Sequence, residues 1–153
     1  NPLMEDAETL AFLRKQAPGA RYVTSVCTGA LVLGAAGLLK GKRATTHWMS
    51  HEMLSALGAT PVAERVVVDG NLITGGGVTA GIDFALRVAA EAFGEDLAKS
   101  IQLGIEYDPH PPFNAGSPEG AGPAVVDRAL TTAAKRQAER AAIVARAAAR
   151  LAG

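Results

Sequence analysis

One cysteine stands among the 153 residues, and its neighbours suit a nucleophile. Cys27 lies in SVCTG, where a β-branched run ends and a run of small apolar residues begins. The order small residue, any residue, nucleophile, any residue, Gly is that of the strand–turn–helix elbow of hydrolases, with Cys for Ser and Ser25 for the first Gly. A following helix would direct unpaired N–H groups at the sulfur and favour its thiolate. Cys27 is therefore a candidate reactive thiol, and a small buried hydrophobe is the alternative that the spacing leaves open.

Two histidines stand four residues apart in HWMSH. On a helix, His47 and His51 would share a face beside Glu52, which raises the question of a metal. The stretch lacks the glutamate placement of the zincin motif, and no third ligand follows at a typical spacing, so we predict no metal site. His47 comes directly after the strand-like ATT, and we expect it to face Cys27 as an orienting or proton-exchanging partner. A histidine with a purely structural role is the alternative.

A glycine-rich stretch, TGGGVTAG, covers residues 74–81. It matches neither GxGxxG nor GxxxxGK[ST], so it does not predict a phosphate-binding loop. We interpret it as a tight strand-to-helix loop whose backbone approaches another group closely, and we expect that group to be the Cys27 pocket. A simple chain reversal is the alternative.

Short buried strands alternate with helices along the chain. We predict strands at 21–26, 43–46, 66–68 and 72–73, with the last two joined as a hairpin at Asp69-Gly70. Helices are predicted at 28–37, 47–57, 78–93, 95–107 and 124–151, with a further helix ahead of Pro18-Gly19 and an irregular, Pro- and Gly-rich stretch from 108 to 123.

This alternation predicts an α/β fold, a three-layer doubly wound and mostly parallel sheet of the flavodoxin-like kind. In such a sheet functional groups gather at the carboxyl ends of strands, which is where Cys27 is placed. The strands are few for this architecture. Because the chain also opens on NPLMEDAETLAF, directly in a helix, we expect further strands in an N-terminal segment.

Fifteen basic residues balance fifteen acidic ones. We therefore expect no general attraction to nucleic acid, and the apolar run from Val32 is broken by Gly and Lys before it reaches membrane-spanning length, so no membrane partner is expected. One unpaired cysteine fits a reducing, cytoplasmic setting. In the Ala-rich helix at 124–151, apolar Ile143, Val144 and Leu151 are expected to anchor it on the domain. Its basic residues are interpreted as a solvated face, namely Lys135, Arg136, Arg140, Arg146 and Arg150.

Taken together, VCTGALVLGAAGLLKGKRATTHW and TGGGVTAGIDFAL resemble the PfpI-like cysteine superfamily of the class I glutamine amidotransferase-like fold. Within it, IQLGIEYDPHPPFNAGSP is similar to the isocyanide hydratases, which add water to an isonitrile and yield an N-substituted formamide through a covalent thioimidate on a cysteine. The resemblance covers almost the whole chain. It implies that residues 1–153 are the C-terminal two-thirds of a single PfpI-like domain that ends in the helix at 124–151.

The resemblance implies roles for individual residues. Cys27 is the nucleophile, His47 falls where many members keep a histidine near the thiol, and the oxyanion site and pocket wall comprise Thr28, Gly29, Gly76, Val78 and Thr79. The family's acidic general acid has no counterpart here and is expected in the N-terminal segment. No cofactor or metal is implied. We expect a small neutral isonitrile as substrate, a small and mostly apolar pocket, and a homodimer.

Two other functions remain as alternatives. Ligand-sensing domains of AraC-type transcription regulators carry a stretch very similar to the one around Cys27, joined to a helix-turn-helix pair. After Pro123 this sequence predicts one long helix without a second helix to form a recognition element, which disfavours a regulator. A redox-sensing or deglycase-type relative would also use an exposed, reactive thiol.

Overall fold

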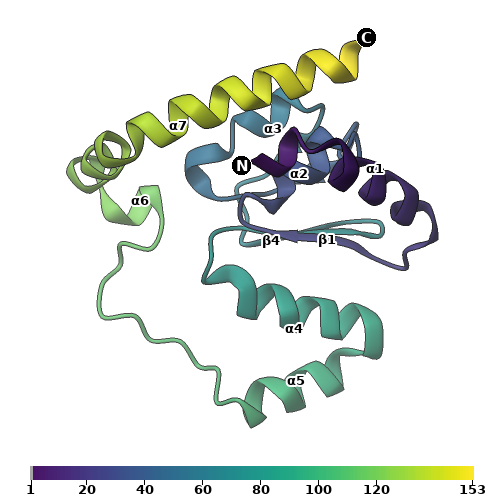
Figure 1. Ribbon diagram of the computed structural model, residues 1–153. Coiled ribbons are helices and arrows are strands. Elements are labelled where there is room, and N and C mark those ends of the chain that lie inside the picture. Colours follow the sequence, from purple (N-terminus) through teal and green to yellow (C-terminus); the bar gives the residue numbers. More distant parts are fainter. Residues whose placement is uncertain (1) are drawn as a thin grey trace.

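The computed structural model describes residues 2–153, and its elements form three layers (Figure 1). On one side of the central sheet lie α1 (Ala7–Gln16), α2 (Gly29–Ala35), α3 (Met53–Ala56) and the long α7 (Pro123–Ala152). On the other side lies α4 (Ala80–Phe93), with α5 (Glu95–Gly104) packed against it. This arrangement confirms the predicted three-layer α/β fold.

The central sheet has the strand order β1-β5-β4, from β1 (Val23–Val26), β5 (Leu72–Gly75) and β4 (Val66–Asp69). Strands β1 and β5 are parallel, with Val26 opposite Gly75, whereas β4 and β5 form the predicted antiparallel hairpin. A second, parallel pair joins β2 (Arg43–Ala44) to β3 (Thr60–Pro61). Because β1 and β5 end at the same edge, Cys27 and the glycine loop after β5 are brought side by side.

Local signals set the helix boundaries. The Asp6 side chain caps α1 by accepting from the backbone N–H of Glu8 at 3.1 Å, which satisfies one of the unpaired donors of the first turn. Gly94 has a φ of 96°, a left-handed conformation that favours glycine, and it separates α4 from α5. Gly122 also has a left-handed φ, of 75°, and it lies directly before Pro123, the first residue of α7.

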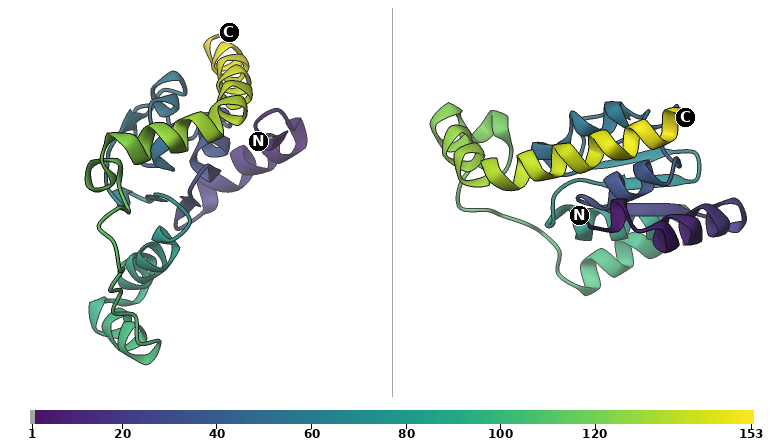
Figure 2. Two further views of the ribbon diagram at one scale, coloured as in Figure 1. Left: turned by 90° about the vertical axis from the view of Figure 1, so that its left-hand side faces the viewer. Right: turned by 45° about the horizontal axis from the view of Figure 1, so that its top comes forward.

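The hydrophobic core lies between the sheet and the α1, α2, α3 and α7 layer. Leu31, Leu39 and Leu54 are fully buried, and α7 contributes Val144 and Ala147 to the same cluster. Val144 therefore anchors α7 on the domain as predicted. The two views of Figure 2 show α7 crossing this helical layer along its length, so the helix is an integral part of the fold.

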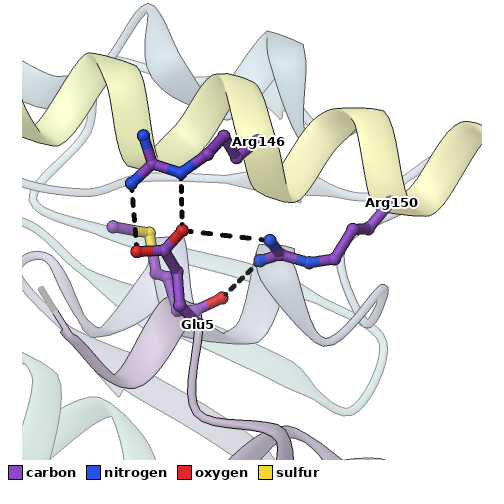
Figure 3. Close-up of polar contacts among 4 residues, drawn as sticks. Glu5, Arg146 and Arg150 are labelled. Carbon is purple, nitrogen blue, oxygen red and sulfur yellow. Dashed lines mark hydrogen bonds and ion pairs between the residues drawn. The ribbon is translucent and has the colours of Figure 1, made fainter.

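The carboxyl-terminal half of α7 is also held by ion pairs to Glu5, which directly follows η1 (Pro2–Met4), and by a hydrogen bond to Met4 of η1 (Figure 3). Glu5 accepts from Arg146 through Nε at 2.7 Å and Nη2 at 3.0 Å, and Arg150 donates to the carbonyl of the fully buried Met4 at 2.9 Å. Such exposed pairs add little stability. They connect α7 to the start of the chain beside the buried Val144 and Ala147.

The predicted helix at 47–57 is wrong. In its place stand a 3-10 turn, η3 (Trp48–Ser50), and the one-turn α3. His47 is extended with a ψ of 134°, and its Nδ1 accepts from the Met49 N–H at 3.3 Å. His51 is held separately by the carbonyl of Val62 at 2.8 Å. A local cap by His47 and the contact of His51 with Val62 accompany the interruption of the helix, so the two histidines do not share one helix face.

The stretch predicted as irregular contains a short helix, α6 (Pro118–Ala121), capped by Ser117. Before it, residues 108–117 cross from α5 to α6 as an exposed extended segment (Figure 1). Tyr107 ties the start of this segment to α4, because its hydroxyl donates to Asp83 Oδ1 at 3.1 Å. Asp83 also pairs with Arg65, and this hydrogen bond raises the pKa of the Arg65 guanidinium.

We expect Tyr107→Phe to loosen the crossing segment while the core stays folded. The lost hydrogen bond to a carboxylate contributes about 1.5–3 kcal/mol, and the Arg65–Asp83 pair remains. Limited proteolysis should cut residues 108–117 faster in this variant. Phe113→Ala is the control, because Phe113 lies in the same segment and is 77% exposed. Equal cleavage rates in Tyr107→Phe and the unaltered protein would show that this contact does not hold the segment.

Candidate active site

Cys27 occupies a strained turn between β1 and α2. Its φ of 57° is left-handed, a conformation that costs a residue with a side chain roughly 1–2 kcal/mol. Both backbone polar groups of Cys27 are hydrogen-bonded. The Cys27 N–H donates to the carbonyls of Gly75 at 3.0 Å and Gly76 at 2.8 Å, and the Thr46 hydroxyl donates to the Cys27 carbonyl at 2.7 Å. The geometry is that of a nucleophile elbow, in which strain presents the side chain at the end of a strand.

The elbow opens into a cavity of about 240 Å³. Cys27, which is half-buried, and Thr28 form one part of its wall. The remaining lining residues come from the turn after β2 and from α7, and they are His47, Met49, Arg136, Gln137 and Arg140. A cavity of this size can receive a small molecule next to the sulfur.

His47 reaches the same cavity from the end of the 43–46 stretch. Gly77 lies beside its ring, since a Cβ on Gly77 would stand 3.6 Å from His47 Cδ2. Because Nδ1 accepts from the Met49 N–H, the hydrogen-bond pattern assigns the proton of the neutral ring to Nε2. Burial lowers the pKa of His47, and the charges of Arg140 and Arg136 lower it further. His47 is therefore neutral at neutral pH.

We expect a titration of His47 by NMR to give a midpoint below its ordinary value of 6.5. Arg140→Gln and Arg136→Gln should each move the midpoint upwards, because each removes a repelling positive charge. Lys135→Gln is the control, since Lys135 is exposed on α7 and does not line the cavity. A midpoint at or above 6.5, or one unchanged by both arginine variants, would contradict this account.

Because the pKa of His47 is lowered on folding, the stability of the protein depends on pH. The folded pKa lies below the unfolded one, so the unfolded chain takes up the proton first as the pH falls. The contribution of His47 to stability is therefore full above pH 6.5 and is lost as the pH falls through the folded pKa.

Arg140 was predicted to lie on a solvated face, and this is wrong. It is buried, with 9% of its surface exposed. Its Nη1 donates to Ser50 Oγ and to Gln137 Oε1, both at 3.0 Å, while its Nε has no hydrogen-bond partner among residues 2–153. Burial, and next the charge of Arg136, lowers the pKa of Arg140, whereas the nearby Cys27 sulfur acts in the opposite direction.

The other residues that the resemblance implied lie around the elbow. Gly29 begins α2, where a Cβ would stand 3.4 Å from Ser25 Cβ, so the backbone of the turn lies close to Ser25. Gly76 contacts Cys27 through its backbone. Val78 and Thr79 lie in the following turn and do not line the cavity formed by residues 2–153; Val78 is 79% exposed.

Sequence reasoning missed four lining residues: Met49, Arg136, Gln137 and Arg140. A signal for Arg140 exists, because it stands seven residues after Ala133 and four before Val144, both buried. That spacing places it on the inward stripe of α7. The cavity is small, as expected, but its lining is a mixture of polar and apolar surface that includes two arginines, instead of being mostly apolar.

Within residues 2–153, no three His, Cys, Asp or Glu side chains are grouped so that they could hold a metal ion. The helices in this part of the chain do not combine the length and apolar character that crossing a membrane requires.

Comparison with known proteins places these features in context. Residues 1–91 match the sequence pattern of the DJ-1/PfpI family. An isonitrile hydratase of Pseudomonas putida is 63% identical over 98% of this chain, and the match covers 66% of that enzyme. The HTH-type transcriptional regulator CdhR of Pseudomonas aeruginosa is 38% identical over 59% of this chain and 27% of the regulator.

A solved structure gives the same result. The THiJ/PfpI family protein from Pseudomonas syringae superposes with a TM-score of 0.85 at 49% identity, covering 95% of this chain and 59% of that protein. The chain thus spans less than two-thirds of the length of these two relatives. With its sheet order, its cysteine elbow and its sequence in agreement, the chain belongs to the DJ-1/PfpI family.

Proposed function

We propose that the complete protein is an isonitrile hydratase that uses Cys27 as its nucleophile. The observation that carries this proposal is the 63% identity to the Pseudomonas putida isonitrile hydratase, which extends over 98% of the chain and so includes both the elbow and α7. The strained Cys27 at the mouth of a small cavity supplies the reactive group that such an enzyme needs.

The proposed reaction has two steps. The Cys27 sulfur adds to the terminal isonitrile carbon, and a proton delivered to that carbon completes an N-substituted thioimidate on the enzyme. Water then adds to the same carbon, the carbon–sulfur bond breaks, and the thiol returns as the formamide leaves. One water is consumed in each cycle, and no cofactor takes part.

We also propose roles for the residues around Cys27. The backbone N–H groups of Thr28 and Gly29, at the start of α2, face charge that develops during addition. Gly76 adjoins the Cys27 backbone, whereas Val78 and Thr79 lie outside the cavity formed by residues 2–153 and would border the pocket only in the complete protein. His47, as a neutral imidazole, orients the reacting groups or exchanges a proton. No carboxyl group lines the cavity formed by residues 2–153, so we place the general acid in another part of the complete protein.

An assay of the complete protein tests the function directly. Purified enzyme is incubated with an aryl isocyanide, and formation of the N-aryl formamide is followed by chromatography. We expect formamide to appear in proportion to enzyme concentration. If no formamide forms above the uncatalysed rate, the hydratase proposal is wrong.

The position of α7 supports an enzyme over a DNA-binding regulator. In a recognition helix, basic side chains face outwards to reach the grooves. Here Arg140 faces the cysteine cavity, and Arg146 pairs with Glu5. Sequence-selective binding of duplex DNA by the complete protein would overturn this interpretation and favour the sensor function.

We further propose a cytoplasmic homodimer in which residues 1–153 form the C-terminal two-thirds of a single domain. The unpaired thiol suits a reducing compartment. An exposed apolar group on α4 and α5 supports an interface, and it comprises Ile82, Phe93, Leu97, Ile101 and Leu103. Light scattering on the complete protein should give twice the mass of one complete polypeptide. Mass spectrometry should show the segment that precedes residue 1. Cell fractionation should place the protein in the cytoplasm.

A further inference from the structure

Arg140 places a buried positive charge at the cavity, and no acidic side chain among residues 2–153 pairs with it. Arg140 is nine-tenths buried, and its two polar contacts, Ser50 and Gln137, are neutral. Its Nε lies buried without a hydrogen-bond partner among the described residues. Burial of an uncompensated guanidinium is unfavourable unless an anion or further acceptors meet it. Arg140 also lines the cavity that contains the nucleophile, so a guanidinium with an unfilled hydrogen-bonding capacity stands at this site.

A second arginine strengthens this observation. Arg136 lies one helical turn before Arg140 on α7 and lines the same cavity, and Gln137 lies between them. No acidic side chain pairs with either arginine in residues 2–153, whereas Arg146 and Arg150 of the same helix pair with Glu5. The α7 wall of the cavity is thus cationic, and the elbow wall carries Cys27 and Thr28.

This division of the cavity suits a molecule with two different ends. A guanidinium binds a carboxylate through two parallel hydrogen bonds, and a buried guanidinium does so more strongly than an exposed one. A carboxylate held on α7 would leave the rest of a small substrate to extend across the cavity of about 240 Å³ to the sulfur. A neutral, purely apolar isonitrile would offer Arg140 no charged acceptor.

We propose that the substrate of this enzyme is an isonitrile that carries a carboxylate, which Arg140 binds with help from Arg136 and Gln137. This proposal rests on the hydratase function and specifies its substrate class. Arg140 acts here as a specificity-determining residue, because it contacts the substrate away from the reacting carbon.

A matched pair of substrates tests the proposal on the complete protein. The probes are 4-isocyanobenzoate and its methyl ester, which differ in charge at one end and share the reactive group. We expect kcat/KM to be at least about 10-fold higher for the acid. Arg140→Gln should reduce the acid-to-ester ratio by about 10- to 100-fold, mostly through KM, because charge-assisted hydrogen bonds are lost. Arg140→Lys should restore part of the ratio.

Lys135→Gln is the matched control, since it removes one positive charge from α7 outside the cavity and should leave the ratio unchanged. Circular dichroism confirms that each variant is folded. Equal losses for acid and ester in Arg140→Gln would overturn the proposal, because Arg140 would then serve the Cys27 thiolate, a carboxyl group of the protein or the fold. A wild-type preference for the ester would overturn it as well.

Calorimetric binding of 4-formamidobenzoate, the product of the acid, separates this proposal from the hydratase function. If neither isonitrile is hydrated, the hydratase function fails. Binding of the carboxylate that is lost in Arg140→Gln and kept in Lys135→Gln would still support an anion site at Arg140. The absence of both turnover and binding would overturn the carboxylate site.

Discussion

Cys27→Ala is expected to abolish formamide production by the complete protein. The chain carries no other thiol in residues 1–153 that could replace it. Loss of a covalent nucleophile typically lowers kcat by roughly 10³-fold or more, because the remaining groups only bind and polarise the substrate. The measurement is the rate of formamide formation from an aryl isocyanide at saturating substrate.

The variant is suited to this test because Ala has a Cβ like Cys. It therefore bears the same left-handed strain at position 27 without adding bulk, and the hydrogen bonds to Gly75 and Gly76 use the backbone alone. The fold should persist. His47→Ala is expected to lower the rate less than Cys27→Ala, since an orienting group does not form the covalent bond. Mass spectrometry of the acid-quenched wild-type enzyme should find the mass of the isonitrile added to the peptide that contains Cys27. Turnover by Cys27→Ala at the wild-type rate would refute the assignment.

Gly34→Ala is expected to destabilise the complete protein by about 1–3 kcal/mol, because it overpacks the contact between α2 and Leu57, the residue that follows α3. A Cβ on Gly34 would stand 2.7 Å from Leu57 Cδ1 and 2.9 Å from Leu57 Cβ. The Leu57 Cβ cannot rotate away, and Leu57 is buried with 2% of its surface exposed. Because α2 follows the elbow directly, its displacement should also lower hydratase activity. Chemical denaturation measures the free energy of unfolding.

Two further variants make the result specific. Gly81→Ala places the same methyl group in open space within α4, and it should raise stability by roughly 0.5–1 kcal/mol through helix propensity. Leu57→Ala should cost about 2–5 kcal/mol by itself. In that background Gly34→Ala should cost less than in the wild type, because the opposing side chain has gone. Additive effects of Gly34→Ala and Leu57→Ala would show that the clash is not the cause.

Local sequence determined the elements whose signals need no distant partner. Ser25, Cys27 and Gly29 predicted the elbow because a sharp turn excludes large side chains at those positions. The Asp69-Gly70 pair predicted the β4–β5 hairpin, and Gly94 predicted the break between α4 and α5. The long helix at the end of the chain followed from its alanine content. In each case backbone conformation or intrinsic propensity decides the structure.

Tertiary structure decided which side chains share the cavity. His47 and His51 were expected on one helix face, but His47 caps the local turn at Met49, whereas His51 is held by Val62 from a later segment. Arg140 stands more than 100 residues from Cys27 in the sequence, and only the packing of α7 on α2 and α3 brings it to the cavity. Its charge suggested a solvated position because propensity and composition describe a helix without its partners. Burial of a charged group depends on what the opposite surface offers, and that surface forms only when the chain folds.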